Sequence, residues 1–446
     1  MLSDKIKNCL SSPLVRNTLK LSSSNIILYF LPIIVTPILS RLYGPDSFGA
    51  WGIFASTYSI IMVIMFGSYD NAIIKAPEED VYPLCRLCLI GGLFTSLITL
   101  VVFYIGDKVG IEFFSTFPSY WLLIAILLIQ LFIVVYSNLL NKYKHYNVLS
   151  ISNLINGCSQ GIFRISWRFI TKFGNGLIIG TVLANSVNLL YLLLKSKTLN
   201  VFRATNSEVL SIAKKYKNFP LFDAPALLLQ FAALNLPVII LSFYFSRADI
   251  GCYSLIVQLL VLPISFIGSA MGKVYYQQIS VNPDDNKQII QKTTLLVLKI
   301  LIYLSVIPSL FICLGGDKLI VWFLGSKWIL AGDMAICMTI WSIPTILTES
   351  LKYLFRIKDE QRKLLYIEIA YFVSGIGLML FGCHFGWNIS EIIFSFSTIC
   401  CLVRFIALAK ILKLSDIHIS MLPKTAPILV VGTIIITISR ALIIIC

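Results

Sequence analysis

One segment of the chain carries side chains suited to binding a multivalent anion. At the helical period, Asn153, Asn156, Gln160, Arg164 and Arg168 fall on one face, while isoleucines and a phenylalanine fall on the opposite face. Each guanidinium can donate two charge-assisted hydrogen bonds to phosphate oxygens, and a pair spaced i and i+4 suits a diphosphate. We therefore expect this face to line water and to bind a phosphate-bearing group through Arg164 and Arg168.

The elements that must position this face are membrane-spanning helices. Thirteen apolar runs of about twenty residues follow one another along the 446-residue chain, and each is long enough to cross a bilayer. The runs are roughly 20–41, 48–69, 84–105, 120–140, 148–169, 176–194, 218–243, 251–273, 294–314, 331–354, 364–383, 390–412 and 425–445. Hydrocarbon leaves no backbone group unpaired and the alternating pattern of barrel strands is absent, so the runs predict helices.

The depth of each arginine in the bilayer determines how strongly it indicates a water-filled cavity. A charged side chain at the centre of a bilayer costs about 2.5–3.5 kcal/mol, so it needs water, a partner or a path to the headgroups. Arg168 lies near the predicted outer end of its span and can extend to the interface. Arg164 lies about a turn deeper, which favours the lumen-facing interpretation more strongly for Arg164.

Basic residues follow the predicted topology. The formal net charge is +15, and most of the 36 Lys and Arg residues fall in alternate loops, as the positive-inside rule requires. This pattern places the amino terminus inside, and residues 1–19 are expected to form a cytoplasmic amphipathic segment rather than a removable signal. The excess charge reflects topology and anionic lipid, so nucleic acid is not an expected partner.

The metal-ligating residue types are scattered. The three histidines, His145, His384 and His418, lie in separate loops, and the eleven cysteines lie mostly within spans. Cys85 and Cys88, three positions apart, are interpreted as packing residues at the inner end of a span. The sequence therefore predicts neither a metal site nor a cofactor.

The chain contains an internal repeat. RLYGPDSFGAWGIF from Arg41 matches FYFSRADIGCYSLI from Phe243, which aligns Gly49 with Gly251. A second pair, GDKVGIEFF and GDKLIVWFL, begins at Gly106 and Gly316. Six spans separate the copies, so both halves have the same orientation, an architecture typical of transporters with the substrate path between the halves.

Four segments resemble one known family. They are LSRLYGPDSFGAWGIFAS from Leu39, FPLFDAPALLLQFAALNLPVIIL from Phe219, DIGCYSLIVQLLVLPISFIGSAMGKVYY from Asp249 and FLGSKWILAGDMA from Phe323. They resemble the polysaccharide transporter family, the O-antigen and capsule oligosaccharide flippases of the MATE-like multidrug/oligosaccharidyl-lipid/polysaccharide exporter superfamily. The resemblance runs over about residues 15–412.

The resemblance implies an all-α polytopic membrane protein, a MATE-like bundle of two six-helix lobes with twelve core transmembrane helices. On this chain the predicted parts are the N-lobe 20–195, a cytoplasmic linker 196–217, the C-lobe 218–413 and an extra helix 425–445. Such proteins usually have twelve or fourteen spans, and a thirteenth places the carboxyl terminus outside.

The resemblance also implies a function. A protein of this family is a transporter rather than an enzyme, and translocates undecaprenyl-pyrophosphate-linked oligosaccharide across the bacterial inner membrane by alternating access. The expected partners are that lipid-linked glycan and membrane lipid, the candidate protein partners are a polysaccharide polymerase and a chain-length regulator, and the expected oligomeric state is a monomer.

Further polar side chains supply candidates for sugar and ion binding. Besides Asn153 and Gln160, the substrate candidates are Asn185, Asn188, Gln230 and Gln258. The structural alternative is that these amides link helices, as they do in any bundle.

Two acids, Asp70 and Asp223, are candidates for proton or sodium coupling; solvated carboxylates at helix starts are the alternative. Glu349 and Lys352 are expected to form a local pair, and Arg404 is expected to extend to the inner interface.

Two other functions remain open. A cation-coupled drug exporter of the same fold should carry a central carboxylate, whereas the face described above is positive. An integral-membrane oligosaccharide polymerase or ligase should carry a long outer loop with arginine and histidine, whereas the outer loops here are short. The sequence supports these two functions less well than it supports a flippase.

Overall fold

The computed structural model describes residues 28, 30–170, 175–196, 205–279, 287–422 and 425–445. Apart from short connections these residues are helical, and none of them lies in a strand. The helices are Phe30–Leu42, α3 (Pro45–Phe66), α4 (Tyr69–Lys75), α5 (Glu78–Val109), α6 (Glu112–Ser115), α7 (Tyr120–Lys142), α8 (Tyr146–Ile170), α9 (Gly176–Lys195), α10 (Asn206–Lys215), η1 (Phe219–Asp223), α11 (Ala224–Leu241), α12 (Arg247–Ile279), α13 (Lys287–Phe311), η2 (Ile312–Gly316), α14 (Asp317–Leu324), η3 (Ser326–Trp328), α15 (Ile329–Leu351), α16 (Tyr353–Ile357), α17 (Gln361–His384), α18 (Ile389–Leu414), η4 (Ile419–Met421) and α19 (Thr425–Ile445). The predicted amphipathic segment 1–19 lies outside the described residues.

The expected all-α membrane fold is confirmed. In the described part of the chain, eleven helices are long and apolar enough to cross a membrane. α8 covers the predicted run 148–169 but is not among the eleven, because its polar face lowers its mean hydropathy. Of the predicted run 20–41, the structure describes residue 28 and residues 30–41, and the latter lie in the apolar helix Phe30–Leu42. The protein is therefore a multi-pass membrane protein in which one helix, α8, is markedly less apolar than its neighbours.

The chain divides into two compact units. The first contains Met1–Tyr43 with Ala50–Ile239, and the second contains Gly44–Gly49 with Ile240–Cys446. The sequence predicts that a linker at residues 196–217 separates two transport lobes. The division into these two compact units does not test that linker, and it stays a prediction.

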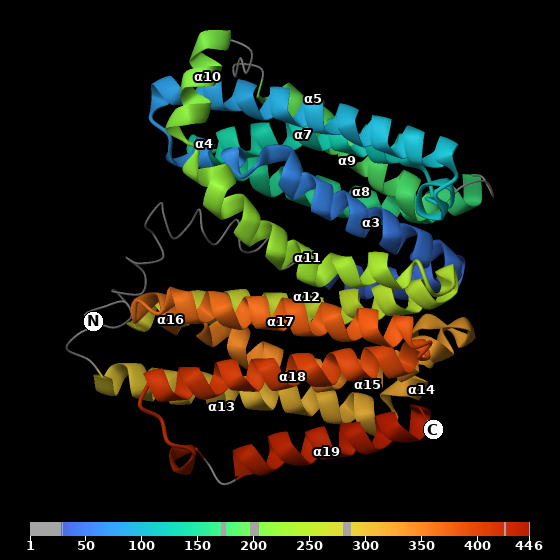
Figure 1. Ribbon diagram of the computed structural model, residues 1–446, viewed down its shortest axis with the longest axis vertical. Coiled ribbons are helices and arrows are strands. Elements are labelled where there is room, and N and C mark those ends of the chain that lie inside the picture. The colour runs from blue at the N-terminus through green and yellow to red at the C-terminus, as the bar shows by residue number, and fades with distance from the viewer. Residues whose placement is uncertain are drawn as a thin grey trace. The chain divides into compact units, whose positions relative to one another are not determined.

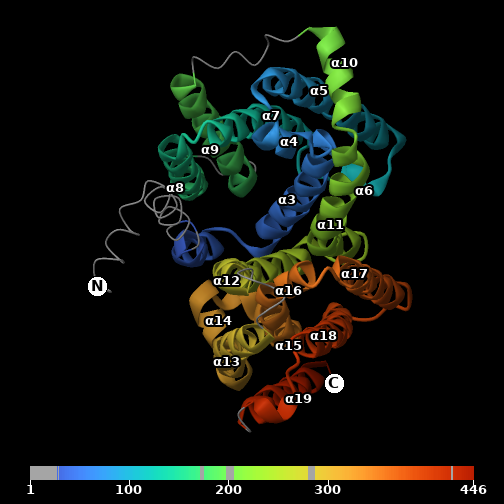
Figure 2. The ribbon, with the colours of Figure 1, turned by 90° about the vertical axis from the view of Figure 1, so that its left-hand side faces the viewer.

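Each unit is held together by its own set of helix–helix contacts. In the first, α7 contacts α5 and α9, α8 packs along α9, and α4 and α10 contact α5 (Figure 1). In the second, α15 contacts α12, α13, α18 and α19 (Figure 2), and nearly all of its residues are buried. A helix that is buried all round forms the core of its bundle.

α19 packs within the second unit. It contacts α13, α15 and α18, and Arg440 Nη2 in its last turns lies 3.5 Å from Asp317 Oδ2 at the start of α14. Its residues Pro427–Ile444 are long and apolar enough to cross a membrane. That α19 is an extra helix beyond twelve core spans stays a prediction.

The glycines aligned by the sequence repeat pack against each other in the second unit. A Cβ on Gly49 would lie 1.8 Å from the carbonyl oxygen of Arg247, and a Cβ on Gly251 would lie 1.9 Å from that of Pro45. Each glycine therefore meets the carbonyl four residues before the other glycine. Only a residue without a side chain allows two backbones to approach this closely.

We expect Gly49→Ala and Gly251→Ala each to lower the yield and thermal stability of the folded protein in detergent. The added methyl group forces the two helix starts apart, and overpacking of this kind costs about 1–3 kcal/mol. Gly377→Ala is the matched control, because no atom lies within 4 Å of its Cβ position and alanine favours a helix. Gly251→Ala protein as stable as the Gly377→Ala protein would contradict the prediction.

Candidate functional site

Arg164 of α8 is held by groups from other elements of the first unit. Its Nη2 donates to Thr181 Oγ1 of α9 at 2.8 Å, and its Cζ lies 5.0 Å from the ring centroid of Trp51 in α3. The hydroxyl of Tyr43 donates to the backbone carbonyl of Arg164 at 2.8 Å. α9 approaches closely because Gly180 has no side chain; a Cβ there would lie 2.8 Å from the Arg164 backbone nitrogen. The guanidinium is thus fixed by neutral groups.

The positive charge of this region has no counter-ion in the described part of the chain. Among the described residues, no carboxylate lies within ion-pair distance of Arg164, and its Nε is buried without an acceptor. Arg168, one turn further along α8, is exposed, and its Cζ lies 5.9 Å from the Tyr43 ring centroid. An uncompensated charge in a span is costly. An anion that comes and goes would relieve that cost.

Amide side chains connect three helices next to Arg164. Asn185 of α9 is 2% exposed, and its Oδ1 accepts hydrogen bonds from Gln130 of α7 at 2.8 Å and from Asn156 of α8 at 3.4 Å. Gln160 donates to Asn156 Oδ1 at 3.1 Å, and Asn185 Nδ2 donates to the carbonyl of Thr181 at 2.8 Å. This amide network therefore ends at the residue whose hydroxyl binds Arg164.

The other predicted substrate residues differ from these in exposure or in the helix that carries them. Asn188 is 3% exposed, and its Oδ1 accepts a hydrogen bond from Ser152 at 2.6 Å. Asn153 of α8 and Gln230 of α11 are exposed, and Gln258 is half-buried on α12 of the second unit. The structure brings Gln160, Arg164 and Asn185 together, and a role of Asn153, Asn188, Gln230 or Gln258 in sugar binding stays a prediction.

The two candidate coupling acids differ in exposure. Asp70 is half-buried on α4, a short helix between two spans, and Asp223 is exposed in η1. Burial raises the pKa of the Asp70 carboxyl, while hydrogen bonds from the Asn71 backbone and the Asn138 side chain oppose part of the rise. The titratable neighbour on α5 is the Cys88 thiol. Of the two acids, Asp70 has the surroundings that favour proton uptake.

The stability of Asp70→Asn protein is expected to exceed that of the unchanged protein at neutral pH, and the difference should shrink as the pH falls. A carboxyl whose pKa is raised on folding contributes full stability below its unfolded pKa and loses that contribution as the pH rises through its folded pKa. Asparagine mimics the protonated form throughout. Thermal unfolding in detergent from pH 4 to pH 8, with Asp223→Asn as the exposed control, measures this; a difference independent of pH would contradict it.

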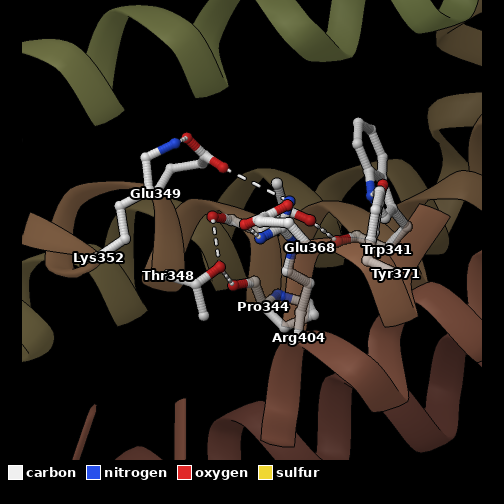
Figure 3. A network of polar contacts seen from close by, with 9 residues as sticks. Trp341, Pro344, Thr348, Glu349, Lys352, Glu368, Tyr371 and Arg404 are labelled. Carbon is white, nitrogen blue, oxygen red and sulfur yellow. Dashed lines mark hydrogen bonds and ion pairs between the residues drawn. The ribbon is translucent and has the colours of Figure 1, made fainter. Parts of the chain in front are cut away.

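A cluster of four charged side chains lies in the second unit (Figure 3). Arg404 of α18 is 7% exposed, and its Nη1 and Nη2 donate to Glu368 of α17 at 2.8 and 3.4 Å. Its Nη2 also lies 3.6 Å from Glu349 of α15, and Glu349 pairs with Lys352 at 2.5 Å. Two cations and two carboxylates make this cluster neutral.

Aromatic residues cover one side of the cluster. The Arg404 Cζ lies 4.4 Å from the ring centroid of Tyr371, whose hydroxyl accepts a hydrogen bond from Trp341 Nε1 at 2.7 Å (Figure 3). The predicted pair of Glu349 and Lys352 is confirmed. The expectation that Arg404 extends to the interface is wrong, because acids on two neighbouring helices compensate its charge inside the bundle.

Several members of these sites are not among the residues predicted from the sequence. Gln130 and Glu368 each stand as a polar residue in a long apolar run, and that isolation was the available signal. Trp51 and Tyr43 lie within the segment from Leu39 that carries the repeat and the family resemblance, and nothing in their spacing connects them to Arg164.

Comparisons with known proteins agree with this architecture. A sequence profile of the family described as polysaccharide biosynthesis protein matches residues 38–333. The chain is similar to the solved structure of the lipid II flippase MurJ in an inward closed conformation, with a TM-score of 0.70 and 13% identity over 95% of this chain and 97% of that one. It is also similar to an inward-facing multidrug resistance MATE family transporter of the MOP superfamily, with a TM-score of 0.66 and 17% identity over 87% of this chain and 95% of that one. No curated protein matches at a significant level. At these identities the solved structures establish the MATE-like fold.

Proposed function

We propose, from the premise that this chain belongs to the polysaccharide biosynthesis protein family, that it flips a lipid-linked oligosaccharide. Family and fold together favour a membrane transporter of a lipid-linked or a drug substrate. The finer proposal is that the substrate is an undecaprenyl-pyrophosphate-linked repeat unit of O-antigen or capsule, moved across the bacterial inner membrane with the amino terminus in the cytoplasm.

The observation that carries the proposal is the contrast between two intramembrane arginines. Arg404 is compensated by Glu368 and Glu349 within its own bundle. Arg164 has no such acid among the described residues and retains a buried Nε without an acceptor. A site that is prepared for an anion, rather than for a cationic drug, has this character.

In the proposed cycle each part of the substrate has its own surroundings. The diphosphate binds Arg164 and Arg168, the glycan lies along polar side chains such as Gln160, and the polyprenyl tail stays in lipid. Access alternates between the two faces of the membrane, and proton uptake by Asp70 is the candidate coupling step. A polysaccharide polymerase and a chain-length regulator remain candidate partners, and a monomer remains the expected state.

Transport by the purified protein in proteoliposomes tests the proposal. The probes are a fluorescent polyprenyl-diphosphate oligosaccharide, the matching monophosphate, and a lipophilic cationic dye. We expect flipping of the diphosphate lipid above the protein-free rate, weaker flipping of the monophosphate and no dye transport. Dye transport without lipid flipping would establish the drug exporter instead.

A further inference from the structure

We propose that Tyr43 and Trp51 are positioning residues that present the two α8 arginines to a diphosphate; this inference rests on the proposed function. Both rings come from the segment Leu39–Ser56, whereas Arg164 and Arg168 lie more than a hundred residues later. The Arg164 Cζ lies over the Trp51 ring at 5.0 Å from the ring centroid, and the Arg168 Cζ lies over the Tyr43 ring at 5.9 Å.

Tyr43 also fixes the backbone of the helix that carries both arginines. Its hydroxyl donates to the Arg164 carbonyl at 2.8 Å, and it lies against the start of α9, where a Cβ on Gly176 would be only 2.1 Å from the hydroxyl oxygen. The Tyr43 ring faces Arg168, one turn along α8. Tyr43 therefore fixes the position of the α8 backbone and the orientation of the Arg168 guanidinium.

Contact with a ring leaves the guanidinium available to a bidentate anion. The ring attracts the cation through its π-face and offers no oxygen acceptor, so the N–H groups remain for phosphate oxygens. Thr181 takes one hydrogen bond from Nη2 of Arg164, and Nε remains without an acceptor. A long flexible side chain that is already ordered loses less conformational freedom when a ligand arrives. Two such guanidinium groups, one turn apart, match two linked phosphates better than they match a single phosphate.

Binding of farnesyl diphosphate and farnesyl monophosphate to the purified full chain in detergent, measured by calorimetry, tests the inference. Trp51→Leu and Tyr43→Leu remove a ring, and each should weaken diphosphate binding about 3- to 30-fold. Trp51→Phe retains a ring and should stay within about threefold of the unchanged protein. Monophosphate binding should change less. Trp121→Leu, at an exposed tryptophan of the first unit, is the control.

A double variant separates positioning from general packing. If Trp51 acts through Arg164, then Trp51→Leu combined with Arg164→Lys should bind no more weakly than Arg164→Lys alone. Equal binding by the unchanged protein and the Trp51→Leu and Tyr43→Leu proteins would overturn the positioning role and leave the flippase standing. Absence of any preference for diphosphate in the unchanged protein would overturn the proposed substrate, and the inference with it. Additive losses in the double variant would show that Trp51 acts on packing.

Discussion

Replacing Arg164 by alanine is expected to slow flipping of the diphosphate-linked lipid about 10- to 100-fold. Hydrogen bonds to charged groups contribute about 1.5–3 kcal/mol, and about 1.4 kcal/mol is a factor of ten. The protein should nevertheless stay folded, because the substitution also removes a buried guanidinium nitrogen that has no acceptor. Loss of transport with retained thermal stability is the signature of a residue that serves the substrate rather than the fold.

The measurement is the initial flipping rate in proteoliposomes, with the apparent melting temperature of the same preparation. Arg164→Lys is the matched variant, because it retains the charge but loses the planar fork and most of the stacking on Trp51. We expect it to fall between the alanine variant and the unchanged protein. Near-normal flipping by both Arg164→Ala and Arg168→Ala would remove these residues from the mechanism.

Neutralising both acids around Arg404 is expected to have the largest effect on stability. Glu349→Gln with Glu368→Gln leaves Arg404, which is 7% exposed, without a counter-ion. Removing the partners of a buried charge costs about 3–5 kcal/mol, and the partial exposure of Glu368 places the expectation near the lower value. Yield of monodisperse protein and thermal unfolding in detergent measure the loss.

Two further variants give this prediction its control. Adding Arg404→Met to the double variant removes the buried unpaired charge and leaves only the more exposed Lys352 without its partner, and should restore much of the lost stability. Glu360→Gln breaks the more exposed pair with Lys363, and should change stability by less than about 1 kcal/mol. A double variant as stable as Glu360→Gln would show that the buried cluster contributes little.

The helices could be predicted because their signals are local. Apolar length alone gave the predicted run 425–445, which α19 matches, and the run 148–169, which α8 contains. The polar face of α8 follows from the helical period within a single segment. The predicted end of the run 294–314 also agrees with the structure, because the chain leaves the helical conformation at Gly315 within η2.

The contacts of the site could be predicted much less well. Arg164 itself follows from its depth in an apolar run, but Trp51 and Tyr43 lie far away in sequence, and no local rule pairs them with it. The same applies to Arg404, whose acids come from two other helices. When each helix is considered alone, a charged residue in a span is expected to extend to the membrane interface. Only packing shows that Arg404 is neutralised within the bundle, whereas no acid of the described residues pairs with Arg164.

The contact of Gly49 with Gly251 also limits which residues the chain can accept there. At each glycine the atom that a Cβ would meet is a backbone carbonyl oxygen, and that atom is present whatever side chain its residue carries. A larger residue at one glycine therefore cannot be accommodated by exchanging a side chain at the other. Both positions are restricted to glycine for as long as the two helix starts keep this distance.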